Sequence, residues 1–86
     1  MPSYKINLNI MPIPSVLDPQ GEAIENSLKN SSNPSASGFR VGKKITFTVR
    51  ASNKRKCKEI VKDLCQKLLV NEVIEEYSFE IYDEKN

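Results

Sequence analysis

The chain has 86 residues, of which 38% are hydrophobic and 28% are charged, and its formal net charge is +2. This length allows one domain with one small core, because so short a chain buries only about 60–65% of its unfolded surface. So small a charge does not by itself indicate a nucleic-acid or membrane partner. No apolar run approaches the roughly 18 residues of a membrane span. The N-terminus lacks a signal-peptide core, so we expect a cytoplasmic protein.

The chain begins with a strand pattern. Apolar and polar side chains alternate over residues 4–10, which is typical of a half-buried strand. The apolar positions are Tyr4, Ile6, Leu8 and Ile10. Pro12 and Pro14 end this strand, because each proline removes a hydrogen-bond donor from the ladder.

A first helix is predicted from about Pro19 to Asn30. Asp18 is its expected N-cap, because a carboxylate there can accept from the free N–H groups of the first turn. Pro19 suits the first helical position, where its missing N–H costs nothing. One side of the helix then carries a modest apolar face that we expect to pack on a sheet, formed by Ala23, Ile24, Ser27 and Leu28.

Gly21 is unusual within this first turn, because glycine in a helix costs about 1 kcal/mol relative to alanine. Two explanations stay open. The turn could pack closely against neighbouring backbone, for which glycine is well suited. Alternatively, Gln20, Gly21 and the free N–H groups could face a partner chain or a ligand.

The middle of the chain is predicted to be a loop followed by two strands. Residues 31–38 are rich in Ser, Asn, Pro and Gly, so we expect a flexible connection. Residues 39–41 and 44–50 read as strands, and Gly42-Lys43 is expected to be the hairpin turn between them.

A second helix is predicted from a cap at Ser52 or Asn53 to about Val70, with Asn71 as its stop. Its inward arc contains Cys57, Ile60, Val61, Leu64, Cys65 and Leu68. A last strand follows over residues 73–81, and the tail 83–86 is expected to be frayed.

These elements predict an α+β fold in the order β-α-β-β-α-β, with both helices on one face of an antiparallel sheet. The other face carries polar side chains: Lys5, Asn7, Asn9, Thr46, Thr48 and Arg50. Such a face is expected to be wet or to pair with a second copy. The small core also favours self-association.

The sequence offers little chemistry of its own. It has no histidine and no C-x-x-C pair, so we expect no metal site, no cofactor and no catalytic residue. Cys57 and Cys65 lie on one predicted helix about 12 Å apart along its axis. That separation is too large for a disulfide, and both are expected to be core residues.

A basic run over residues 50–58 suggests an alternative, a free-standing nucleic-acid-binding module. No aromatic residue interleaves with this run, although single-stranded nucleic acids are usually bound by stacking aromatics. Glu59 and Asp63 soon offset its charge. We therefore expect a solvated helix face and no nucleic-acid partner.

Four segments in this order resemble one small family: residues 15–24, 39–44, 65–71 and 73–77. The most specific piece is Leu17-Asp-Pro-Gln-Gly21, supported by the Val41-Gly-Lys43 and Asn71-x-Val-Ile-Glu75 segments. The family is the S subunit (PurS) of the multi-subunit phosphoribosylformylglycinamidine synthase of purine biosynthesis. The resemblance covers nearly the whole chain.

The resemblance implies a non-catalytic accessory subunit of an ATP-dependent, glutamine-using ligase. It implies a homodimer or tetramer that joins the glutaminase subunit to the synthase subunit and supports ammonia transfer. The residues expected to contact partners lie in the quoted segments: Asp18, Pro19, Gln20, Gly21, Arg40, Gly42, Lys43, Asn71 and Glu75.

Overall fold

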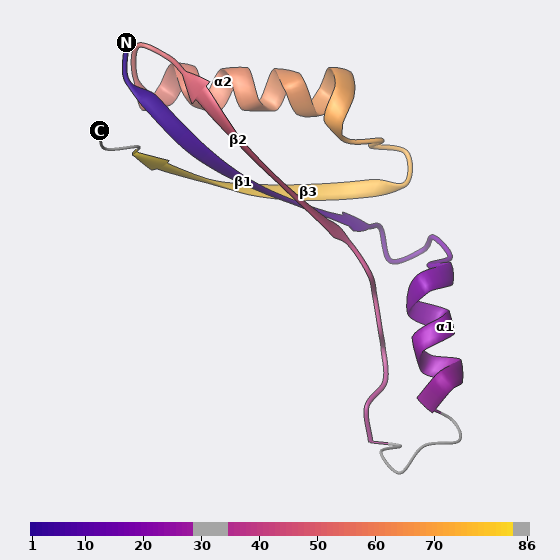
Figure 1. The fold of residues 1–86 in the computed structure, drawn as a ribbon. Coiled ribbons are helices and arrows are strands. Elements are labelled where there is room, and N and C mark those ends of the chain that lie inside the picture. Colours follow the sequence, from indigo (N-terminus) through magenta and orange to yellow (C-terminus); the bar gives the residue numbers. More distant parts are fainter. Residues whose placement is uncertain (29–34, 84–86) are drawn as a thin grey trace.

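Three strands form one antiparallel sheet in the order β2-β1-β3 (Figure 1). The structure is a computed structural model that describes residues 1–28 and 35–83. Its strands are β1 (Ser3–Pro12), β2 (Lys43–Arg50) and β3 (Glu75–Asp83), and its helices are α1 (Pro19–Leu28) and α2 (Lys54–Leu64). A π-helical turn, η1 (Cys65–Leu69), directly extends α2. The predicted α+β class and the antiparallel sheet are confirmed.

The central strand β1 aligns the apolar residues of its two neighbours. Ile6 lies between Phe47 of β2 and Ile81 of β3, and Leu8 occupies the equivalent place two residues on. Because side chains alternate between the two faces of a strand, these residues point to the same face. Each row of paired apolar side chains therefore crosses all three strands on one face of the sheet.

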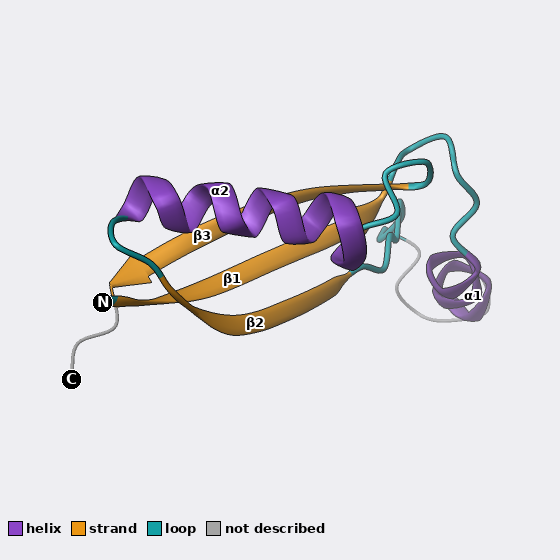
Figure 2. Ribbon diagram, turned by 90° about the horizontal axis from the view of Figure 1, so that it is seen from above, coloured by secondary structure: helices purple, strands orange, loops and turns teal. Residues whose placement is uncertain are grey.

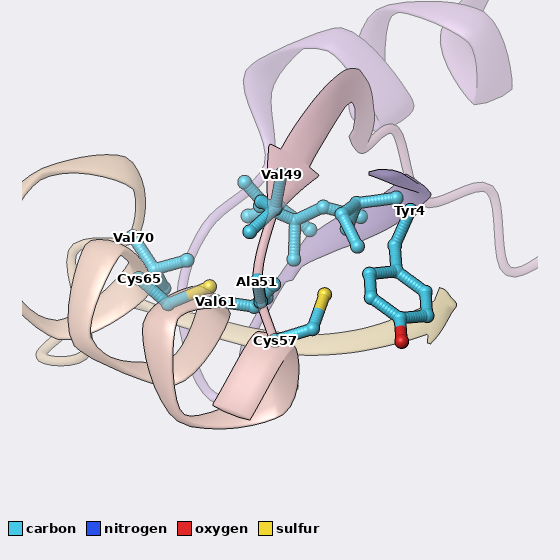
Figure 3. Close-up of a cluster of buried hydrophobic side chains, with 10 residues drawn as sticks. Tyr4, Val49, Ala51, Cys57, Val61, Cys65 and Val70 are labelled. Carbon is cyan, nitrogen blue, oxygen red and sulfur yellow. The ribbon is translucent and has the colours of Figure 1, made fainter. Parts of the chain in front are cut away.

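Helix α2 covers this apolar face (Figures 1 and 2). The close-up in Figure 3 shows Cys57 and Cys65 of the helical segment, and Val70 just after it, in one cluster with Val49 of β2 and Tyr4 of β1. The buried hydrophobic residues are Tyr4, Ile6, Leu8, Ile10, Val49, Ala51, Cys57, Val61, Cys65 and Val70. The predicted burial of both cysteines is confirmed.

The opposite face of the sheet is polar, as predicted. Its side chains are exposed on β2 at Thr46, Thr48 and Arg50, whereas Asn7 and Asn9 on the central strand are half-buried.

The predicted strand over residues 39–41 is wrong, and so is the hairpin turn at Gly42-Lys43. Among the described residues, β2 begins only at Lys43, which pairs directly with Ile10 of β1. The backbone N–H of Val41 is occupied by a carboxylate, at 2.6 Å from Asp18 Oδ2, so it joins no ladder. Gly42 has no positive φ; the glycine with φ +73° is Gly38, at the end of the connection.

The prediction that both helices cover the sheet is wrong for α1. Figures 1 and 2 show α1 beyond the end of the sheet, well away from α2. Ile24, expected on the sheet-facing side, is 41% exposed. The physical reason is that residues 13–18 carry the chain past the sheet end, where hydrogen bonds fix α1 to residues 39–41.

The second helix begins as predicted but ends differently. Asn53 is its cap, since Asn53 Oδ1 accepts from the N–H of Lys56 at 2.8 Å. At its end, the N–H of Val70 donates to the carbonyl of Cys65 at 3.1 Å, five residues back, which defines the π turn.

This π turn changes which leucine faces the core. The inserted residue rotates Leu68 away from the sheet, leaving it 76% exposed, and Leu69 packs against the core in its place. The placement of Leu68 on the inward arc is therefore wrong. The predicted end of the helical segment near Val70 is confirmed, because η1 ends at Leu69 and Val70 is its cap. Asn71 follows that cap and does not have the positive φ that a left-handed stop requires.

Part of the predicted flexible connection 31–38, namely 31–34, lies outside the described residues, as does most of the predicted tail 83–86. Of the tail, Asp83 is the last residue of β3. Within the described ranges, no helix has the length and apolar character needed to cross a bilayer.

Candidate partner-binding site

The Asp18 carboxylate holds two segments together at the start of α1. Its Oδ1 accepts from the N–H of Gly21 at 3.1 Å, and its Oδ2 accepts from the N–H of Val41 at 2.6 Å. These two hydrogen bonds, with help from the charge of Arg40, lower the pKa of the Asp18 carboxyl, although burial opposes them. The predicted cap is confirmed, and it also anchors a segment 23 residues further along the chain.

Glycine is the only residue type that fits at position 21. A Cβ added there would overlap the carbonyl oxygen of Phe39. Glycine allows this close approach of two backbones. The close-packing explanation of Gly21 is therefore the one that the geometry supports.

Two further side chains fix the extended segment 39–41. Glu25 of α1 accepts from the N–H of Phe39 at 2.8 Å. On the other side, Arg40 Nη2 donates to the carbonyl of Ile13 at 2.8 Å. The segment is thus held between α1 and the chain that leaves β1.

Gly42 lies against β1 in the same manner as Gly21 lies against Phe39. A Cβ at Gly42 would overlap the carbonyl oxygen of Ile10 and the sulfur of Met11. The next residue, Lys43, places its Nζ 3.4 Å from Glu75 Oε2. Because the lysine is largely exposed, this ion pair adds little stability.

The turn from Asn71 to Glu75 supplies the third side of the site. The N–H groups of Ile74 and Glu75 both donate to the carbonyl of Asn71, and Glu75 Oε1 accepts from the N–H of Asn71 at 2.8 Å. The carbonyl of Ile74 accepts from the N–H of Ile13 at 2.9 Å, which ties this turn to the end of β1.

These three segments surround a hollow of about 300 Å³, which we call the junction hollow. Its lining residues are Ile10, Pro12, Val16, Leu17, Asp18, Pro19, Gln20, Val41, Gly42, Lys43, Ile74 and Glu75. The structure therefore brings together six residues predicted from separate segments: Asp18, Pro19, Gln20, Gly42, Lys43 and Glu75. Of the other three, Gly21 packs under Phe39, Arg40 borders a neighbouring hollow, and Asn71 forms the turn.

Sequence reasoning missed the apolar residues of this site. Leu17 is 72% exposed and Ile74 is 42% exposed, and both line the junction hollow. An apolar residue just before a helix cap usually packs on its own helix, so the sequence pattern would have predicted burial of Leu17. In the structure Leu17 is instead open to solvent.

The lining of the junction hollow determines what the site can do chemically. The junction hollow has an apolar floor and a rim of polar and charged side chains. Among residues 1–28 and 35–83, no group of His, Cys, Asp and Glu is arranged to hold a metal ion. Burial raises the pKa of the Cys57 and Cys65 thiols, so neither is an activated nucleophile.

The basic run lies elsewhere on the molecule. Lys54, Arg55 and Lys58 border a shallow hollow beside Phe79 and Ile81 of β3, at the beginning of α2. None of the residues predicted to contact partners lies there.

Comparison with known proteins identifies the family. The family model described as PurS, phosphoribosylformylglycinamidine (FGAM) synthase, matches residues 5–83. The chain belongs to the PurS family. The PurS subunit of Thermotoga maritima is 43% identical over 77 residues, covering 90% of this chain and 94% of the relative. The Bacillus subtilis PurS subunit is 37% identical over 78 residues, covering 91% and 92%.

Solved PurS structures share the fold. The match to a chain of the PurLQS structure from Thermotoga maritima has a TM-score of 0.85 at 41% identity, covering 94% of this chain and 99% of that chain. Methanocaldococcus jannaschii PurS, described as one subunit of formylglycinamide ribonucleotide amidotransferase in the purine biosynthetic pathway, matches with a TM-score of 0.81 at 29% identity, covering 95% and 99%. The resemblance drawn from the sequence is confirmed.

Proposed function

We propose that this PurS chain is a non-catalytic accessory subunit of phosphoribosylformylglycinamidine synthase. In this role it bridges the glutaminase and synthase subunits in the cytosol. It thereby supports the transfer of ammonia from glutamine to the ATP-dependent amidation step of de novo purine biosynthesis. Family membership supports this role, as does the PurLQS structure that contains a relative.

The junction hollow is the observation that carries the proposal. Its exposed apolar residues, Leu17 and Ile74, stand beside backbone that Asp18, Gly21 and Gly42 hold in fixed positions. A pre-organised apolar hollow with a polar rim is typical of a protein–protein contact. The predicted contact residues therefore divide into a scaffold and a contacting set.

The scaffold consists of Asp18, Gly21, Arg40, Gly42 and Asn71, whose backbone or side-chain groups are used inside the chain. The contacting set consists of Gln20 and Lys43, which are exposed, together with Pro19 and Glu75 on the same rim. We propose that the synthase subunit packs on this rim.

Substitution Gln20→Ala tests the contact. Loss of one hydrogen bond to a buried partner group costs roughly 1–3 kcal/mol, which corresponds to a roughly 5- to 150-fold weaker complex. Titration against the two large subunits measures this affinity. Glutamine-driven activity should fall, whereas activity driven by added ammonia should fall less.

The matched control is Asn26→Ala, an exposed change on the same helix outside the hollow. It should leave assembly and both activities as in the parent. If Gln20→Ala behaves like this control, the contact is not at the hollow. If the large subunits use glutamine equally well without the chain, the proposed function itself is wrong.

We also propose that the chain forms a homodimer or tetramer. The molecule measures 54 × 30 × 14 Å and has a radius of gyration of 17.0 Å. A compact chain of this length has a radius of gyration of about 12 Å. So extended a chain leaves apolar surface to be covered by another copy. Sedimentation that finds only monomer at micromolar concentration would contradict self-association.

A further inference from the structure

The beginning of α2 carries basic side chains that play no part in the junction hollow. Lys54, Arg55 and Lys58 are exposed and border a hollow of about 560 Å³, which we call the basic hollow. Its other lining residues are Phe79 and Ile81 of β3. Among the described residues that line the two hollows, none is shared, so the basic hollow is a separate surface.

Helical spacing places the lysines on one flank of α2. Lys54 and Lys58 are four residues apart, and Lys62 follows after four more, so successive lysines lie one above the other. Lys58 borders the hollow with Phe79 and Ile81, which places this flank beside β3. Figure 2 shows α2 running along the sheet above β1 and β3. Because β3 is an outer strand, no described strand lies beyond it, and a ligand can approach from that side.

The acidic residues of α2 do not neutralise this flank. Within residues 1–28 and 35–83, Glu59 pairs with Lys56 at 3.7 Å and Asp63 pairs with Lys67 at 3.1 Å. Neither lysine lines the basic hollow. At the exposed end of β3, Asp83 lies opposite Tyr4 on the helix-facing side and offsets part of the charge. The helix has five basic residues against two acidic ones, so the flank keeps an excess of positive charge.

The floor of the basic hollow is apolar. Phe79 and Ile81 alternate along β3 and pack against the core from the outer strand, so each is only partly buried. A purely ionic ligand would leave this apolar surface in contact with water, whereas an apolar group would cover it. A ligand suited to the hollow therefore combines anionic groups with an apolar one.

Two classes of macromolecule have this combination, an acidic protein segment and a single-stranded nucleic acid. Nucleic-acid binding relies on aromatic rings that are free to stack on bases. Phe79 is half-buried, and its ring already stacks with that of Tyr77, with 6.4 Å between the ring centroids. An aliphatic side chain needs no such stacking surface. The basic hollow therefore favours a protein segment.

We propose that the basic hollow binds a segment of a partner protein in which acidic and apolar side chains are interspersed. The acidic side chains pair with Lys54, Arg55 and Lys58, and an apolar side chain covers Phe79 and Ile81. The exposed ion pairs speed association and select the partner, while the apolar contact slows dissociation. The proposal does not depend on the subunit role, because none of these residues belongs to the contacting set at the junction hollow.

Fluorescence polarisation with labelled synthetic peptides tests the class of ligand. The first peptide alternates glutamate and leucine; in the second, glutamine replaces glutamate, and in the third, serine replaces leucine. The parent chain should bind the first peptide at least roughly tenfold more tightly than either of the others. Added salt should weaken this binding, because the charges are exposed. Changing the peptide instead of Phe79 keeps the fold of the chain intact.

Three results of this titration would overturn the proposal. If the serine peptide binds as tightly as the first, the apolar floor is not used. If the glutamine peptide does so, the basic residues are not used. If poly-uridylate RNA binds more tightly than the first peptide, the basic hollow is a nucleic-acid site.

A pair of double variants locates the site. Lys54→Gln combined with Lys58→Gln removes two charges from the hollow and should weaken binding of the first peptide roughly tenfold. Lys56→Gln combined with Lys67→Gln removes the same charge outside the hollow and should change the dissociation constant by less than roughly threefold. Circular dichroism checks that both variants keep their helices. Equal weakening by the two would indicate a general attraction to a basic helix and would contradict the proposal.

Discussion

The sheet with α2 and the arm formed by α1 and residues 39–42 are held by different forces. All the buried hydrophobic residues of the described chain belong to the sheet, to α2 and η1, or to the residues that directly follow β2 and η1. The arm buries Gly21 instead, next to the buried cap residue Asp18. The carboxylates of Asp18 and Glu25 position the arm by accepting from backbone N–H groups, and Arg40 does so by donating to a backbone carbonyl.

Because of this difference, we expect the sheet with α2 to supply most of the stability and the arm to supply the contact surfaces for the large subunits. Apolar burial is cooperative across a packed core, so the sheet and α2 should unfold as one unit. The arm has few contacts and open backbone, so it should open locally at a lower free energy. The contacts that we propose for the synthase subunit lie on the arm or at its junction with the sheet.

The largest effect is expected from Leu8→Ala. Leu8 is fully buried between Ile45 and Phe79, and its truncation should lower the free energy of unfolding by about 2–5 kcal/mol. Urea unfolding followed by circular dichroism measures the change. The arm should be lost together with the sheet, since nothing else supports it. A change below about 1 kcal/mol would mean that the core is not centred on β1.

Gly21→Ala should act on the arm alone. The added Cβ meets the Phe39 carbonyl, and such overpacking costs about 1–3 kcal/mol. Hydrogen exchange should show faster exchange of the Val41 amide, while amides within the β1–β3 ladder keep their protection. Asn26→Ala is the control on the same helix. Equal loss of protection in both regions would contradict the division into two parts.

A pair of leucine substitutions tests the π turn. Leu69→Ala removes a side chain that packs on the core and should cost about 1–2 kcal/mol. Leu68→Ala removes an exposed side chain and should change stability by less than about 0.5 kcal/mol. Thermal or urea unfolding compares the two. The reverse order would indicate a regular α-helix through this segment.

The smallest expected effect is the dependence of the arm's local stability on pH. The pKa of Asp18 is lowered in the folded chain, so its ionised form stabilises the arm. This contribution is fully present above the unfolded pKa, at about pH 4, and is lost as the pH falls through the lower folded pKa. Exchange of the Val41 amide should therefore accelerate only in strong acid. Asp18→Asn should remove this acid dependence, and an unchanged dependence would assign it to another carboxyl.

Sequence patterns predicted the sheet and α2 well, because their periods are set by local chain geometry. Tyr4, Ile6, Leu8 and Ile10 alternate as a strand requires, and Cys57, Val61 and Cys65 recur at helical spacing. The pattern over residues 39–41 was too short to separate an extended segment from a paired strand. Most of the predicted contact residues meet at the junction hollow, although the sequence could not supply its apolar floor.

The class of fold, the start of each helix, the core-facing residues of the strands and the family could all be predicted from local sequence patterns. The position of the arm and the end of α2 could not, because they depend on tertiary contacts. Asp18 was recognisable as a cap, but its second oxygen bonds to Val41, a residue distant in the sequence. The π turn likewise exchanges Leu68 for Leu69 by one inserted residue. Both depend on contacts between segments that no local period encodes, which is why the strand and helix patterns did not reveal them.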